Sequence, residues 1–435
     1  MRPRYWMVAA IAVVALVVAA CGDGDATPTP AGAPKLGGVS VIHQWVSGGE
    51  PESFSAVVQP WEELTGGRVD DIGTRDLLAI VTTRVKGGNP PDIAALAAPG
   101  TMQKFVKDGE LVALDSFLDM SKFRGEYSQA WIDLCTVDGK LYCIAWKASN
   151  KSTVWFNPTQ LQAMGMSVPT TWDQLLANSK RWADAGIAPW SIGVESGGAS
   201  GWPGTDWIGQ LVLSESGPDV YDQWINHEIP FNDSRIKSAW EKFGQIAVTP
   251  GYVPGGANFI LSTNFVPASY LPFESPPKAG MYFLGSFTQG FIEEQFPDLI
   301  IDEDYSFFPF PSIVPQFANA VTGGADLLVM FNDDPSSRSL MQYFAASASQ
   351  QIWVGRGGFT STNSRVSLDN YPNPLARKVA EQLTTANIFR FDADDIWGGE
   401  LQAAFWKGIL DYLADPSKLD SILADIEKVA AQQLG

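Results

Sequence analysis

The sequence predicts an α/β fold built as two domains. The chain has 435 residues, which is more than one ordinary core accommodates and suits two lobes of common domain size. Short apolar runs typical of buried strands alternate with longer segments in which apolar residues recur at helical spacing. This alternation favours mostly parallel sheets covered by helices.

The N-terminal part of the folded chain begins this pattern. Its expected elements are a strand at 38–46, a helix at 52–64 that ends before Gly66 and Gly67, a helix at 77–88, a strand at 90–98 and a helix at 101–114 that stops near Gly109. A strand followed by a helix is the repeating unit of an α/β fold.

The rest of the chain continues the alternation. Residues 152–165 predict a strand and a short helix, and 170–186 a helix with Thr170 or Thr171 as N-cap candidate and Gly186 as its stop. Further strands are expected at 188–194, 278–287 and 305–311, and further helices at 233–247, at 336–355 as one long helix, and at 373–383, 400–413 and 418–434.

The N-terminus is typical of an export signal. Residues 1–20 carry two arginines and then an apolar run that is shorter than a membrane-spanning helix needs. The letters "VAAC" at 18–21 resemble a bacterial lipobox, which predicts that Cys21 becomes lipid-modified; the alternative is a plain signal peptide with an incidental cysteine. Residues 21–38, rich in Gly, Pro, Thr and Ala, are expected to form a flexible tether.

Composition excludes several classes of partner. With 48 acidic and 29 basic residues the formal charge is −19, and no basic cluster occurs outside the signal, so nucleic acid is a poor partner. Only His43 and His227 are present, which argues against a multi-histidine metal site. We expect no metal and no cofactor.

Two further cysteines flank a turn. Cys135 and Cys143 lie on either side of Asp138-Gly139 in "LCTVDGKLYC", which predicts a disulfide across a hairpin in an exported protein. A strict two-residue turn would place Cys135 opposite Tyr142, so the pairing needs a bulge. The alternative is two buried free thiols.

Enzyme motifs are scarce, whereas aromatic residues in loops are frequent. "GGASG" at 197–201 has Ala199 where a nucleophilic serine would stand, and "GRGG" at 355–358 lacks phosphate-loop spacing. A glycosidase-like pair of carboxylates stays an alternative, because such a pair is set by distance in space, but no local pattern indicates one. Trp45, Trp146, Trp202 and Trp397 stand at strand ends or in loops, where aromatic platforms beside carboxylates would suit a sugar ring. The alternative is that these tryptophans belong to the core.

The segment "SGWPGTDWIG" at 200–209 combines both uses of tryptophan. Trp202, between Gly201 and Pro203, is expected in a cleft, and Trp207, one turn before Leu211, in the core. Asp206 is either a hydroxyl acceptor or the N-cap of the helix that begins there.

The order of "VSVIHQW", "WEELTGGRVD", "GNPPDIAAL", "DGKLYCIAW", "NKSTVWFNP", "PTTWDQLL", "SGWPGTDW", "MYFLGSF" and "FPFP" resembles the extracellular solute-binding proteins of bacterial ABC importers, in the group that binds maltose and α-glucosides. The resemblance covers the chain from about Val39. It implies a periplasmic-binding-protein fold of two α/β lobes joined by a hinge that the chain crosses more than once. Lobe 1 would hold 39–147 and 308–347, and lobe 2 would hold 148–307 and 348–435.

The resemblance also implies ligand contacts in the cleft. By position they fall at Trp45, Glu50, Asn150 beside Lys151, Glu195, Trp202, Phe287 and Trp406. Asp206, Arg356 and Trp397 are added as candidates from their local sequence, because the guanidinium fork of Arg356 could reach a ligand or the other lobe. Where maltose binders carry sugar contacts, this chain has Ala97, Ala98, Pro99 and Gly100, which argues against maltose itself.

The function expected from these features is that of a receptor and not of an enzyme. It would be exported, anchored by lipid at the outer face of the cell membrane, and monomeric, and it would deliver an oligosaccharide or α-glucoside to permease subunits. A secreted glycosidase or other cleft enzyme and a surface adhesin lipoprotein are the alternatives.

Overall fold

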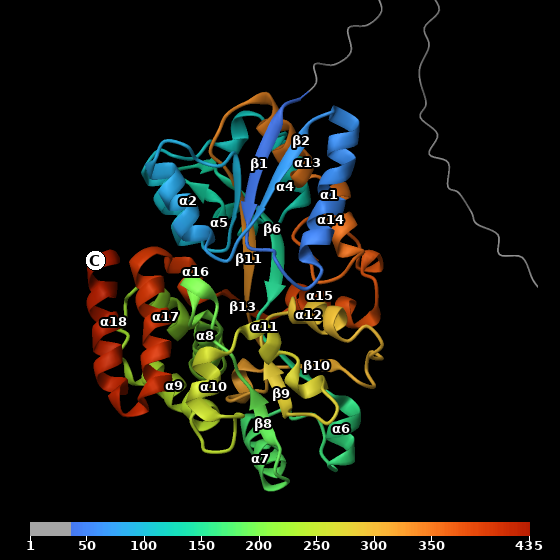
Figure 1. The fold of residues 1–435 in the computed structure, drawn as a ribbon. Helices are drawn as coiled ribbons and strands as arrows, with labels where there is room; N and C mark the ends of the chain where they lie inside the picture. Colours follow the sequence, from blue (N-terminus) through green and yellow to red (C-terminus); the bar gives the residue numbers. More distant parts are fainter. Residues whose placement is uncertain (1–35) are drawn as a thin grey trace, which may run out of the picture. The chain divides into compact units, whose positions relative to one another are not determined.

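The computed structural model describes residues 36–435, and the predicted signal peptide at 1–20, the lipid site at Cys21 and the tether as far as residue 35 lie outside the described residues. Within 36–435 the chain forms two mixed sheets, each with its own covering helices (Figure 1). Strands β4 (Thr136–Val137) and β5 (Lys140–Leu141) form a separate two-stranded sheet. No helix in this part combines the length and apolar character that crossing a membrane would need.

The first sheet has the order β12-β6-β11-β3-β1-β2, and β13 adds to β11. Its strands are β1 (Gly38–His43), β2 (Arg68–Gly73), β3 (Ile93–Leu96), β6 (Cys143–Asn150), β11 (Ala320–Met330), β12 (Thr360–Ser361) and β13 (Ile388–Phe391). Strands β1, β2 and β3 run parallel, whereas β11 is antiparallel to β3 and β6. Its helices are α1 (Glu50–Thr65), α2 (Leu77–Lys86), α3 (Pro99–Lys107), α4 (Met120–Glu126), α5 (Gln129–Leu134), α13 (Pro335–Ala345) and α14 (Ser347–Val354). We call this sheet with these helices lobe 1.

The second sheet has the order β10-β7-β9-β8, formed by β7 (Thr153–Phe156), β8 (Ala188–Ser191), β9 (Ala279–Phe283) and β10 (Ser306–Pro309). Its helices are α6 (Pro158–Ala163), α7 (Trp172–Asp184), α8 (Trp202–Ile225), α9 (Ser234–Ala247), α10 (Gly256–Ser262), α11 (Phe265–Ala268), α12 (Thr288–Gln295), α16 (Ala393–Trp397), α17 (Gly399–Ala414) and α18 (Leu419–Gln433). Both faces are buried: Val154 and Phe156 join one apolar cluster, and Trp155 between them joins another. We call this sheet with its helices lobe 2.

The chain passes between the lobes three times. Lys151 and Ser152 connect β6 to β7, the segment after β10 leads into β11, and α15 (Pro374–Thr385) with β13 leads back toward α16. Helix α15 serves both sides, since Ala376 belongs to the lobe 1 cluster and Leu375 to a lobe 2 cluster. A connection that crosses repeatedly is the hinge arrangement that the family resemblance implied.

The sheets divide at different residues from the predicted lobe boundaries. Strand β10 and the segment that follows it pack with lobe 2, although 308 was expected to open a lobe 1 segment. Helix α14 and strand β12 belong to lobe 1, although 348–435 was assigned to lobe 2. The reason is packing: Trp353 and Phe359 are buried in the lobe 1 core against Trp146.

The helix predicted at 336–355 is two helices. At Ala346 the backbone turns to φ −78° and ψ 141°, which ends α13 before α14 begins. The carbonyls just before the break accept hydrogen bonds from distant side chains, Trp146 Nε1 to Phe344 at 3.0 Å and Tyr127 Oη to Ala345 at 2.9 Å. These contacts replace helical hydrogen bonds, which is why the local sequence carried no signal of the break.

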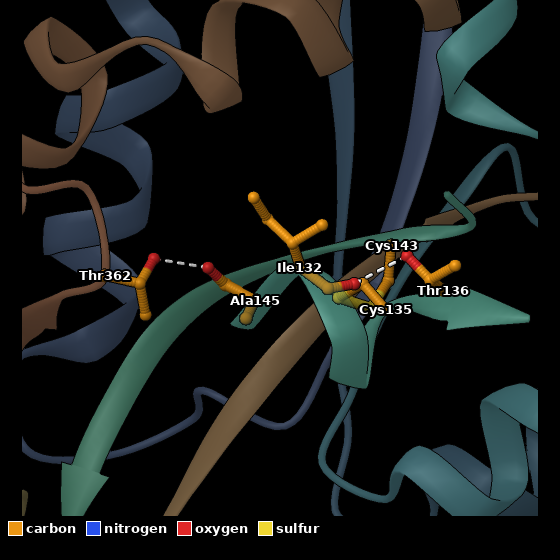
Figure 2. Close-up of a disulfide and its surroundings, with 6 residues drawn as sticks. All are labelled: Ile132, Cys135, Thr136, Cys143, Ala145 and Thr362. Carbon is orange, nitrogen blue, oxygen red and sulfur yellow. Dashed lines mark hydrogen bonds between the residues drawn. A yellow bond between two sulfur atoms is a disulfide. The ribbon is translucent and has the colours of Figure 1, made fainter. Parts of the chain in front are cut away.

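Cys135 and Cys143 form a disulfide (Figure 2), as the sequence predicted. The turn is the strict two-residue kind, because Val137 pairs with Lys140 and the Tyr142 amide donates to the Cys135 carbonyl. No bulge is needed: Cys135 is the helical C-cap of α5 and not part of the strand, so its side chain can reach Cys143. The bond ties α5 to the start of β6.

Candidate functional site

A cavity of about 560 Å³ lies between the two lobes. Its volume falls within the range of small-molecule binding sites. Aromatic side chains from both lobes line it: Trp45, Trp202, Phe265, Phe287, Phe291 and Trp406. Charged side chains lie between them: Glu50, Arg75, Asp76, Lys147, Lys151, Asp326, Asp394 and Asp395. This mixture can stack on an apolar face and hydrogen-bond to polar groups around its rim.

Trp202 forms part of the wall because of the glycine that precedes it. Gly201 has φ 112°, and a side chain there would meet the backbone of Trp406 at 2.4 Å. Helix α8 therefore begins directly at Trp202, whose half-buried ring packs edge-on to Phe265 at 5.0 Å and near Phe287 at 6.0 Å. The three rings make one aromatic wall on lobe 2.

On the lobe 1 side, Lys147 is held by two carboxylates. Its Nζ lies 2.8 Å from Glu50 Oε1 and 4.0 Å from Asp326, and all three side chains are nearly buried. Asp326 also accepts from Trp45 Nε1 at 2.7 Å. Burial opposes the charged form of Lys147, but Glu50 and Asp326 outweigh it and raise the lysine pKa.

On the lobe 2 side, Lys151 is surrounded by carboxyls. Its Nζ bonds to Asp392, to Asp206 at 3.0 Å and to Asp395 at 3.3 Å, and it lies 5.6 Å from the centre of the Trp202 ring. Burial opposes its charge, but the carboxyls raise its pKa well above the ordinary value. Both lysines therefore stay charged at neutral pH.

Contacts between the lobes close the cavity around its edges. The Gly48 amide of lobe 1 donates to Glu294 at 2.7 Å, and the Gly198 amide of lobe 2 donates to Asp76 at 3.3 Å. The Arg75 guanidinium lies 5.0 Å from the centre of the Phe265 ring. The structure thus describes a conformation in which the lobes touch.

Six of the residues predicted to contact a ligand line this cavity: Trp45, Glu50, Lys151, Trp202, Phe287 and Trp406. They come from segments far apart in the sequence: Glu50 and Trp202 are the first residues of α1 and α8, and Trp406 lies within α17. Ala97 and Ala98, where the sequence departs from maltose binders, also line it. That these side chains contact a ligand stays a prediction.

Five predicted residues lie elsewhere. Trp397 is 4% exposed and packs on Trp224 in the lobe 2 core, because its Nε1 donates to the Ile225 carbonyl. Arg356 lies in a separate hollow and donates to Ser53 Oγ at 3.0 Å.

The other three predicted residues are bonded to neighbouring residues around the cavity and do not line it. Asn150 is buried in the hinge and bonds to Gln382, and both carboxylate oxygens of Glu195 are used by the Gly197 amide and by Asn264. Asp206 is neither an N-cap nor a cavity residue: α8 starts four residues earlier, and the aspartate is buried against Lys151. Trp207 lies in the core, as expected.

Several cavity residues were missed by sequence reasoning. Arg75 and Asp76 follow β2, a strand that was not expected, and Asp326 lies on β11, which was also not expected. Asp394 and Asp395 stand beside the predicted Trp397 in "DADDIWGG", so a run of acidic residues next to a tryptophan was the one available signal.

A two-lobed α/β fold with a hinge of several crossings and a cavity between the lobes defines a periplasmic-type binding protein. Residues 47–351 match the family described as bacterial extracellular solute-binding protein. The chain belongs to that family, which is one of binding proteins rather than enzymes.

Two relatives are similar over most of their length. The osmoprotective compounds-binding protein GgtB of Synechocystis sp. is 37% identical over 367 residues, which cover 84% of this chain and 86% of the relative. The α-glucosides-binding periplasmic protein AglE of Rhizobium meliloti is 33% identical over 390 residues, which cover 87% and 84%.

Solved structures match the fold. The bacterial solute receptor AcbH, described as having an exclusive preference for β-D-galactopyranose, aligns with a TM-score of 0.80 at 18% identity, covering 92% of this chain and all of that one. A chitin oligosaccharide binding protein also aligns at 0.80, with 17% identity over 91% of this chain and 98% of that one. At these identities the likeness concerns the fold.

Proposed function

We propose that this protein is the substrate-binding component of an ABC importer that captures an oligosaccharide or α-glucoside between its lobes and delivers it to the permease. The interlobe cavity carries the proposal. A sugar ring has an apolar C–H face and a rim of hydroxyls, and the wall of Trp202, Phe265 and Phe287 beside charged side chains suits both.

The size of the cavity and the relatives favour this class of ligand. About 560 Å³ leaves room for more than one sugar ring. AglE, 33% identical, is named for α-glucosides. Alanines at 97 and 98 on the wall leave that part of the cavity without the charged and aromatic contacts of maltose binders.

Capture would work through the hinge. A ligand that contacts both lobes binds the closed form more tightly than the open form and shifts the population toward it. A closed receptor presents a surface that a permease can distinguish from the empty one. Lipid modification of Cys21 would keep a monomeric receptor beside its transporter.

A thermal-shift screen over glucosides and oligosaccharides tests this function. A ligand present at about 100 times its dissociation constant adds about 2.7 kcal/mol of stability, which raises the melting temperature by several degrees. We expect a disaccharide or trisaccharide with an α-glucosidic bond to give the largest shift. Recovery of the sugar intact excludes a glycosidase, and a flat response to the whole panel contradicts the proposal.

A small osmoprotective compound is the second candidate, because GgtB, 37% identical, is named for such compounds. The screen therefore includes glycine betaine beside the sugars. A shift with betaine and none with glucosides would favour this second candidate.

A further inference from the structure

Three buried carboxyls lie together at the cavity wall, where Asp394 lines the cavity and the other two lie behind it. Asp206, Asp392 and Asp394, which we call the carboxyl triad, are each 1% exposed, and one oxygen of each lies within 4.8 Å of the others. Asp206 comes from α8, and the other two come from the start of α16, where the third crossing enters lobe 2. The carboxyl triad thus joins α8 to the hinge.

The negative charge around the carboxyl triad exceeds the positive charge. Within residues 36–435, Lys151 is the single cation that forms an ion pair with a member of the carboxyl triad. It pairs with Asp206 and Asp392, and also with Asp395. If the carboxyl triad and Asp395 were all ionised, their four negative charges would face the one positive charge of Lys151. Three uncompensated charges in a buried site would cost a large amount of free energy.

Other titratable groups near the carboxyl triad supply no balancing charge. Tyr221 and Tyr282 are buried, and their hydroxyls donate to the Phe391 carbonyl at 3.0 Å and the Phe265 carbonyl at 2.7 Å. Asp326 adds a further negative charge near Asp395.

Three oxygens of the carboxyl triad lack hydrogen-bond partners. They are Oδ2 of Asp206, Oδ1 of Asp392 and Oδ1 of Asp394, and all are sealed from solvent within the described chain. A buried polar atom without a partner costs about 1–3 kcal/mol. One proton between Asp206 and Asp392 and another between Asp392 and Asp394 would give every one of these oxygens a partner.

We propose that the carboxyl triad holds two protons at neutral pH, with Asp206 and Asp394 as neutral acids that donate to an ionised Asp392, and that this network positions Lys151 and Trp406 at the cavity wall. Lys151 bonds to Asp392, so the ionised member faces the ammonium. Trp406 Nε1 donates to Asp394 Oδ2 at 2.5 Å, which links the network to the cavity.

The electrostatic directions agree with this arrangement. Burial raises the pKa values of Asp206 and Asp394 well above the ordinary range. Burial also opposes ionisation of Asp392, but Lys151 and the hydrogen bonds from its two neighbours outweigh it and lower the pKa of Asp392. Rising pH therefore removes protons from Asp206 and Asp394, which breaks their hydrogen bonds to Asp392 and leaves like charges that push the three carboxylates apart. This separation shifts Lys151 and Trp406 away from their positions at the cavity wall.

Isosteric amides test the protons without any ligand. Asp206→Asn keeps the shape, stays neutral and donates an N–H to Asp392, so we expect a melting temperature at neutral pH equal to or above that of the unaltered protein. Asp392→Asn removes the ionised acceptor of Lys151 and should lower it by several degrees. Infrared spectra should show the carbonyl band of a buried protonated acid at neutral pH, weakened in Asp206→Asn.

Two results would overturn the protonated network. One is an infrared spectrum without a protonated acid, combined with an Asp206→Asn variant that is as unstable as Asp392→Asn. The other is a divalent cation bound in stoichiometric amount by elemental analysis, with a loss of melting temperature on chelation. That cation would supply the missing charge in place of protons.

The effect on the cavity rests on the proposed function and is tested separately. Titrating the best ligand from the screen between about pH 6 and about pH 9 should show affinity falling as pH rises, and the Asp206→Asn profile should be flatter. Equal profiles for both proteins would overturn the positioning role. If no ligand binds, the proposed function fails while the infrared and stability results still decide the protonation.

Discussion

Trp202 is the side chain whose removal should separate ligand binding from folding. It is half-buried at the cavity wall, where its ring contacts Phe265 and Phe287. We expect Trp202→Ala to weaken sugar binding about tenfold or more, which corresponds to about 1.4 kcal/mol, because one stacking face is lost. Calorimetric titration measures the affinity, and urea unfolding measures the stability.

Trp207, five residues along the same helix, is the matched control. It is 1% exposed and packs on Trp190 and Phe283 in the lobe 2 core. Trp207→Ala should cost about 3–5 kcal/mol of stability. If Trp202→Ala were the more destabilising of the two and bound sugar normally, its assignment to the cavity wall would be wrong.

Lys147 should be essential for stability as well as for the cavity. Lys147→Met leaves Glu50 and Asp326 buried without their cation, and removing one partner of a buried pair costs about 3–5 kcal/mol. Because the folded pKa of Lys147 is raised, its contribution is present below the ordinary lysine pKa and is lost only as pH rises through the raised value.

Urea unfolding at neutral and at strongly alkaline pH measures that contribution. The difference between Lys147→Met and the unaltered protein should be large at neutral pH and should shrink in strong alkali. Lys180→Met is the control, because Lys180 pairs with Asp184 on an exposed helix surface and should matter little. Equal effects of the two substitutions at neutral pH would contradict the buried pair.

At single positions, sequence patterns predicted aromatic residues better than charged ones. Trp202 follows a glycine and precedes a proline, which keeps it out of a core, and it lines the cavity. Arg75 and Asp326 had no such signal, because the loop after β2 and the strand β11 that carry them are distant in the sequence and meet only in the folded chain. Trp397 was predicted in the cleft because its Gly-rich sequence context resembles a loop, but its ring is buried in the lobe 2 core.

At the level of elements, the disulfide should stabilise lobe 1 without affecting ligand binding. The cysteines are eight residues apart, and closing such a short loop is worth about 2–3 kcal/mol. Neither lines the cavity. We expect the double variant Cys135→Ser, Cys143→Ser to melt several degrees lower with unchanged affinity. A change in affinity without a change in melting temperature would be inconsistent with this role.

Helices with caps were the elements that sequence predicted most accurately. Helix α7 begins after Thr171, whose side chain accepts from the Gln174 amide, and Gly186 follows its end with φ 80°. Strand β11 was missed because Gly323 and Gly324 interrupt its apolar run. A side chain at Gly323 would lie 2.9 Å from the Ser149 carbonyl, so the glycine that hides the strand is required by its close packing on β6.

At the level of the whole molecule, the two-lobed arrangement is the one that the family resemblance implied. Which segments belong to which lobe could not be predicted from the sequence. Helix α14 and strand β12 return to lobe 1 because Trp353 and Phe359 complete its aromatic core. Two of the three crossings are tied together by buried side chains: Gln210 of α8 accepts from Ser152 on the first crossing and from Thr322 at the end of the second. Such a hinge allows the lobes to rotate while each core stays intact.

Small-angle X-ray scattering with and without the best ligand from the screen tests the central claim most directly, because it reports whether the ligand is captured between the lobes. The contacts of Gly48 with Glu294 and of Asp76 with Gly198 are made by opposite lobes, so they belong to the closed form. We predict that saturating ligand decreases the radius of gyration. A ligand bound at one site per chain, with an unchanged scattering profile, would contradict capture by closure.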